Sequence, residues 1–160
     1  MSAFQIRFVT DHDFVSWAIR KVTFSEFSHV ELVTDEGTYI GAHARGGIKE
    51  RVDDPDDLPT FERRYSLPCT QAQKDKIFAY ARSKIGTKYN FRDIFGLLIH
   101  SNFSSPNRLI CSMFVFEAAL AGGIQMLNVL PRYSNLVTPD TLHLSPLLIG
   151  RCVYQTAKPE

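Results

Sequence analysis

Apolar and polar residues alternate along the first part of the chain. Phe4, Ile6 and Phe8 are separated by single residues, Gln5 and Arg7, a period of two that is typical of a half-buried strand. The same period returns from residue 27 onward, and the turn-forming segment 35–37 indicates a hairpin. Strands are predicted in this way over 4–8, 27–33, 38–42, 48–52 and 61–67.

A helical period replaces this alternation after residue 70. Thr70 and Gln73 have the spacing of a capping box, and Gly86 ends the helix that follows. Its inner face is predicted from three apolar residues four positions apart: Ile77, Ala81 and Ile85. Further helices are predicted over 14–18, 91–100 and 109–120, a helical turn from 138, and a closing strand over 147–154. Because strands gather early and helices late, with one strand at the end, we expect an α+β fold with an antiparallel sheet.

The length and the net charge of the chain limit the number of domains and the kinds of partner that we expect. The chain has 160 residues, of which 44% are hydrophobic and 22% charged, so a single domain over 1–160 is expected. A formal net charge of +1 provides no bulk attraction to nucleic acid or to an anionic membrane. No apolar run reaches the roughly 18 residues of a membrane span, and the N-terminus lacks the order of a signal peptide. Nothing in the sequence indicates the oligomeric state.

The cysteines and the acidic residues do not have the spacing of a metal site. Cys69, Cys111 and Cys152 are odd in number and widely separated, which matches neither a disulfide framework nor a zinc ribbon. The acidic stretch 53–57 lacks the ligand spacing of an EF-hand, so a solvated connection is expected there. We therefore expect no metal ion and no other cofactor.

Cys111 stands at the start of the most apolar predicted helix. A thiol in the first turn of a buried helix faces unsatisfied N–H groups and the positive end of the macrodipole. Both favour the thiolate, which is the reactive form of cysteine. An unreactive core cysteine has the same pattern, so the helix alone leaves two interpretations open.

A cysteine nucleophile needs a base, usually histidine, and a third polar group that orients the base. Among the five histidines, His29 is the best placed, because it lies on a predicted strand with Glu31 about 7 Å away on the same face. That face is expected to meet the cysteine helix, with Val30 and Leu32 packing away from it. His43 falls on the return strand, across the hairpin from His29. Taken singly, these residues have structural alternatives, namely a half-buried histidine, a solvated carboxylate and an exposed histidine.

Four short motifs occur in an order that resembles a known family. They are Ser28-His29-Val30-Glu31-Leu32-Val33, then Gly41-Ala42 with Gly46-Gly47-Ile48, then Ile85-Gly86-Thr87-Lys88-Tyr89-Asn90-Phe91, then Cys111-Ser112-Met113-Phe114-Val115. Together they resemble the circularly permuted branch of the NlpC/P60 superfamily, the permuted papain-like amidases related to the YiiX type. In that branch the histidine strand precedes the cysteine, as it does here over residues 28–115.

The resemblance implies a papain-like fold, in which an antiparallel sheet packs against helices and the nucleophile begins a helix. Cys111 would be the nucleophile and His29 the base. The third catalytic residue would be Glu31 or His43, with Glu31 ranked first. We expect His29 to lie within hydrogen-bonding reach of Cys111.

The resemblance also implies how the substrate is held. Tyr89 and Ser112 would line the site and contribute to an oxyanion hole, beside backbone N–H groups near Cys111. One position departs from the family pattern. Many relatives carry an acidic residue two places after the cysteine, where this chain has Met113.

These residues predict a cysteine hydrolase that cleaves an amide or related acyl bond through a thioester. The resemblance suggests peptide or lipid-linked acyl substrates, including cell-wall peptides (peptidoglycan), and a cytoplasmic or phage-virion location. Two alternatives stay open. One is an inactive binding module with the same fold, and the other is a metal site built from His29, His43 and Cys111, which no short ligand spacing supports. For the hydrolase we expect activity without stoichiometric zinc.

Overall fold

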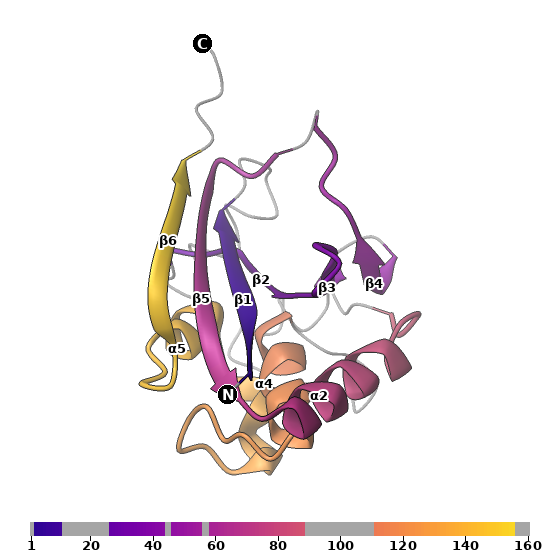
Figure 1. Ribbon diagram of the computed structural model, residues 1–160, viewed down its shortest axis with the longest axis vertical. Coiled ribbons are helices and arrows are strands. Elements are labelled where there is room, and N and C mark those ends of the chain that lie inside the picture. Colours follow the sequence, from indigo (N-terminus) through magenta and orange to yellow (C-terminus); the bar gives the residue numbers. More distant parts are fainter. Residues whose placement is uncertain (1, 11–25, 44–45, 56–57, 89–110, 156–160) are drawn as a thin grey trace, which may run out of the picture.

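The computed structural model describes residues 2–10, 26–43, 46–55, 58–88 and 111–155. Within them, six strands form one sheet (Figure 1). In chain order they are β1 (Ser2–Thr10), β2 (His29–Val33), β3 (Tyr39–His43), β4 (Gly47–Arg51), β5 (Phe61–Cys69) and β6 (Ile149–Gln155). The order across the sheet is β4-β3-β2-β1-β5-β6, and every neighbouring pair is antiparallel. The predicted α+β class with an antiparallel sheet is confirmed.

The first strand, β1, lies inside the sheet between β2 and β5. Its Phe4, Ile6 and Phe8 are buried, as the alternation predicts. β1 pairs with β5 along its whole length and with β2 on its other side. The last strand, β6, pairs with β5. The two ends of the described chain therefore meet in the same sheet.

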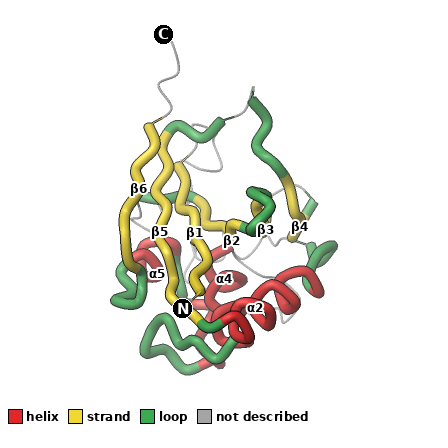
Figure 2. Tube along the Cα trace, viewed as in Figure 1, coloured by secondary structure: helices red, strands yellow, loops and turns green. Residues whose placement is uncertain are grey.

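Helices complete the described part of the fold: α2 (Gln71–Ser83), α4 (Cys111–Ala121), α5 (Pro139–His143) and the 3-10 helix η1 (Pro131–Leu136). Figure 2 shows these helices gathered in the lower part of the view, beneath the strands. The predicted helices over 14–18 and 91–100 lie outside the described residues. None of the described helices is both long enough and apolar enough to cross a membrane.

α2 begins as predicted and ends slightly earlier than predicted. Thr70 caps it, and the reciprocal capping box with Gln73 is present. Ile77 and Ala81 of its inner face are fully buried. The prediction for Ile85 was wrong, because the helix already ends at Lys84 and Ile85 is 45% exposed. The chain turns away at Gly86, whose φ of 90° favours glycine.

The core lies between the sheet and α4. Phe114, Val115 and Phe116 of this helix are fully buried and share one apolar cluster with Val30 and Leu32 of β2. The expectation that Val30 and Leu32 pack away from the cysteine helix was therefore wrong. A helix that is apolar on nearly every side is most stable against the most apolar face available, and that face carries Val30 and Leu32.

Candidate active site

The candidate site lies where an end of β2, an end of β3 and an end of α4 come together. His29 is the first residue of β2, His43 is the last residue of β3, and Cys111 is the first residue of α4. The Cys111 side chain is buried and lies close enough to the His29 side chain to help raise the pKa of that histidine. This influence agrees with the predicted proximity of the two residues, although the face of β2 that packs on α4 was predicted incorrectly. Because His29 begins β2 and Cys111 begins α4, the two side chains can approach each other at the edge of the core.

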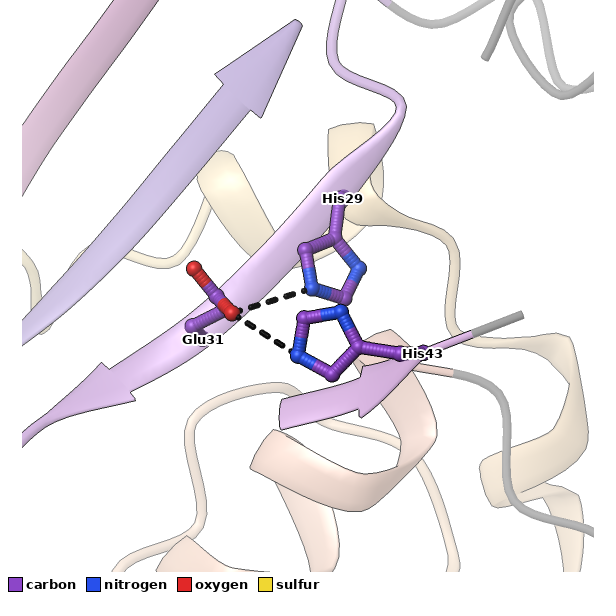
Figure 3. A group of neighbouring side chains, drawn as sticks. All are labelled: His29, Glu31 and His43. Carbon is purple, nitrogen blue, oxygen red and sulfur yellow. Dashed lines mark ion pairs between the residues drawn. The ribbon is translucent and has the colours of Figure 1, made fainter. Parts of the chain in front are cut away.

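Glu31 lies between the two histidines. Its side chain is fully buried, and its Oε1 atom lies 3.3 Å from His29 Nε2 and 3.1 Å from His43 Nε2 (Figure 3). These are close but poorly aligned contacts, since neither buried Nε2 atom has a hydrogen-bond partner of standard geometry among the described residues. Both candidates for the third residue thus reach the site, and Glu31 is the one that contacts His29 through a carboxylate.

The surroundings of His29 favour its charged form. Burial alone lowers the pKa of His29, but its contacts with Cys111 and Glu31, and their negative charges, outweigh that effect and raise the pKa to about 10. Burial also raises the pKa of Glu31, yet contacts with both histidines and the charges of His29 and Arg51 bring it well below its ordinary value. The Glu31 carboxylate therefore stabilises the fold above its ordinary pKa, and this contribution is lost on acidification.

His43 has the opposite behaviour. Its pKa is lowered, first by burial and then by the positive charges of His29 and Arg51, which together outweigh the attraction of Glu31. At neutral pH the cluster thus holds an imidazolium at His29, a carboxylate at Glu31 and a neutral imidazole at His43. Of the two histidines, only His29 therefore has surroundings that raise its pKa and hold a proton beside Cys111.

Gly41 of β3 makes room for this cluster. A Cβ atom at position 41 would lie 2.8 Å from Glu31 Cγ and 3.2 Å from His29 Nε2. Both distances are shorter than ordinary van der Waals contact. The absence of a side chain therefore lets the carboxylate and the imidazole lie against the neighbouring strand.

We expect Gly41→Ala to slow alkylation of Cys111 by iodoacetamide about ten-fold or more, because the added methyl displaces Glu31 or His29. Ala42→Gly is the matched control, since Ala42 is buried in the apolar core on the other side of the same strand. It should cost about 0.5–1 kcal/mol of stability and leave the alkylation rate nearly unchanged. Equal rates in wild type and Gly41→Ala would contradict this role for the glycine.

A group of arginines lies behind Glu31. Arg7 of β1 is fully buried, and its Nη1 donates to Glu31 Oε2 at 3.2 Å. Arg51 of β4 donates through Nε to Oε1 at 3.3 Å and through Nη2 to Oε2 at 3.2 Å. Arg7 also binds Asp53 through two nitrogens, at 2.8 and 2.7 Å, and Glu62 through Nε at 2.8 Å. The catalytic candidates are therefore connected to a buried ionic network.

This ionic network was not predicted from the sequence. The stretch 53–57 was expected to be a solvated connection, and for Asp53 this was wrong, because its carboxylate pairs with the buried Arg7. Arg7 occupies a polar position of the β1 alternation, so the pattern carried no signal that its side chain is buried. Its partner could not be found without the strand register, which sets Arg7 opposite Glu31.

The two residues expected to line the site differ in what the structure says of them. Tyr89 lies outside the described residues. Ser112 is fully buried, and its hydroxyl donates to the backbone carbonyl of Val137 at 2.6 Å. A contribution of Ser112 to an oxyanion hole would therefore come from its backbone N–H group. Cys69 is buried and unpaired, and burial raises the pKa of its thiol.

No protein-family model and no curated protein matches the chain. A solved structure does match: metalloprotein yiiX from Escherichia coli O157:H7 (DUF1105), with a TM-score of 0.62 and 18% sequence identity. The match covers 99% of this chain and 98% of that chain. The chain has the yiiX fold. At this identity the likeness to yiiX shows the fold alone.

Proposed function

We propose that the protein is a cysteine hydrolase of the permuted papain-like (NlpC/P60) type, with Cys111 as nucleophile and His29 as base. The observation that carries the proposal is the place of the buried Cys111 at the start of α4 near His29, whose pKa Cys111 and Glu31 raise to about 10. A histidine that holds a proton at neutral pH beside a thiol stabilises the thiolate. The yiiX fold and the order of the four motifs agree with this assignment.

The proposed reaction uses these positions as follows. Nε2 of His29 faces Glu31, so Nδ1 is left to exchange a proton with the thiol. The Cys111 thiolate attacks the carbonyl carbon, and the imidazolium gives its proton to the departing amine or alcohol as the carbonyl–leaving-group bond breaks. The resulting thioester is cleaved by a water molecule whose proton returns to His29, and the acid leaves.

Each remaining group has a separate task. The Glu31 carboxylate orients His29 and stabilises its charge, as the third member of such a triad does. The neutral His43 lies on the other side of the Glu31 carboxylate, with its Nε2 atom 3.1 Å from Glu31 Oε1. Backbone N–H groups at the first turn of α4, including that of Ser112, are free of helical partners and would stabilise the oxyanion.

The substrate and the cellular setting are part of the same proposal. We infer an amide or acyl bond in a peptide or a lipid-linked acyl group, with peptidoglycan peptides as one class, and a cytoplasmic or phage-virion location. Support comes from the resemblance of the motifs to the permuted amidases.

Iodoacetamide at mildly acidic pH should label Cys111 before the other cysteines. The reason is that His29 holds a proton beside it, whereas burial raises the pKa of the Cys69 thiol. Mass spectrometric mapping of the adducts checks this expectation, with Cys111→Ser as the control that should lose the rapid adduct. Earlier labelling of Cys69 or Cys152 would contradict it. An inert Cys111 would favour the alternative of a binding module without activity.

A divalent metal site is the second candidate. The donor atoms of His29, Glu31 and His43 lie within 4.8 Å of one another, and two imidazoles with a carboxylate are a common donor set for zinc. The buried Nε2 atoms lack aligned hydrogen-bond partners within the described residues, and yiiX is described as a metalloprotein. The donors thus suit a metal in type and spacing, but both oxygens of Glu31 already accept hydrogen bonds from Arg51. A metal bound there would supply Lewis-acid chemistry.

A further inference from the structure

The Glu31 carboxylate is more crowded with nitrogen groups than a triad carboxylate needs. Its Oε1 atom is approached by His29 Nε2 at 3.3 Å, by His43 Nε2 at 3.1 Å and by Arg51 Nη2 at 3.2 Å. The Arg51 Nε atom adds a further contact at 3.3 Å. The lone pairs that would coordinate a metal therefore already accept hydrogen bonds from a guanidinium.

Arg51 is placed differently from Arg7. Arg7 is fully buried and binds three carboxylates, so it belongs to the core of the sheet. The Arg51 side chain is 27% exposed, at the last position of β4, and it pairs with Glu31 and Asp53. Its guanidinium can be changed with less damage to the fold than that of Arg7.

We propose that Arg51 is a positioning residue that reserves Glu31 for His29 and excludes divalent cations from the cluster of His29, Glu31 and His43. This inference rests on the proposed hydrolase. A guanidinium within 3.3 Å of Oε1 repels a divalent ion in a site of reduced dielectric constant. It also keeps the carboxylate in the orientation that faces His29.

The exclusion matters because the two uses of the cluster compete. An imidazole whose Nε2 lone pair is bound to a metal carries its remaining proton on Nδ1. His29 in that state has no free lone pair to accept a proton from Cys111. The same three side chains can therefore support proton transfer or hold a metal, and the charge of Arg51 favours proton transfer.

The experiment compares zinc affinity in Arg51→Gln, Arg64→Gln and wild type, by competition with a chromogenic chelator. Arg64 is the matched control: it is 24% exposed, belongs to the same network, and pairs with Glu62 and Tyr39. Both variants lose one positive charge. We expect Arg51→Gln to bind zinc at least about ten-fold more tightly than wild type, with Arg64→Gln close to wild type. Adding His43→Ala to Arg51→Gln should remove the gain.

Two further measurements make the result decisive. Arg51→Lys retains the charge, so it should exclude zinc nearly as well as wild type. Zinc should slow Cys111 alkylation in Arg51→Gln and have little effect in wild type. The inference is overturned if Arg51→Gln gains no affinity, if Arg64→Gln gains as much, or if wild type already binds zinc as tightly. Failure of the hydrolase proposal is recognised separately, as a wild-type Cys111 that stays inert in the presence of a chelator.

Discussion

Replacing His29 with alanine should slow alkylation of Cys111 at pH 7 by about ten-fold or more, because a thiol with the ordinary pKa near 8.5 is only about 3% ionised at that pH. The variant removes the group that shares a proton with the thiol. It should also abolish turnover of any substrate that is found. The rate is measured with iodoacetamide under pseudo-first-order conditions, alongside circular dichroism to show that the fold is retained.

His43→Ala is the matched control, because His43 contacts Glu31 and His29 but carries the lowered pKa. It should reduce the rate less than about three-fold, in keeping with an indirect role. Equal losses in the two variants would contradict the assignment of His29 as base.

The pH dependence of stability adds a second readout of His29. Its folded-state pKa of about 10 lies above the ordinary value of 6.5. Its charged contacts therefore stabilise the fold fully below about pH 6.5, and this contribution is lost as the pH rises through about 10. The alkaline loss of stability should be smaller in His29→Ala.

Replacing Arg7 with methionine should lower the free energy of unfolding by about 3–5 kcal/mol, the range found when one partner of a buried ion pair is removed. Methionine keeps much of the volume, but Glu31, Glu62 and Asp53 lose the cation that they share. The Glu31 and Glu62 side chains are nearly or completely buried, so water cannot replace the lost contacts. Urea denaturation followed by tryptophan fluorescence or circular dichroism measures the loss.

Arg82→Ala provides the comparison for a surface arginine. Its side chain is 48% exposed and pairs with Glu36 and Glu50. Such pairs contribute about 0–1 kcal/mol. If Arg7→Met costs no more than Arg82→Ala, the buried network does not stabilise the fold as we describe.

Local patterns were sufficient for the elements of the fold. Alternation placed β1 to β5 within a few residues, and the Thr70 capping box marked the start of α2. Both signals act over a single turn or strand, so they do not depend on distant contacts. Ile85 was misplaced because helix ends depend on capping and on the turn at Gly86 more than on period.

The candidate site was only partly accessible from sequence. Nothing in the spacing of His29 and Cys111 brings them together; the pairing came from resemblance, and the argument from strand faces was wrong. Glu31 was expected on the same strand face as His29 and lies 3.3 Å from it, while its full burial and its arginine partners depend on strand register. Arg51 was missed because its role appears only when β4 is folded beside β3.

The burial of Arg7 also constrains the order in which the protein folds. Its partners lie 24, 46 and 55 positions away, at Glu31, Asp53 and Glu62. Until those segments arrive, the guanidinium keeps its water, because an unpaired buried charge is too costly. A hydrated charge beside the apolar residues Ile6, Phe8 and Val9 makes this segment less prone to self-association. Arg7 would thus protect the newly made first strand from aggregation before the native pairing, which is slow for such distant contacts, is complete.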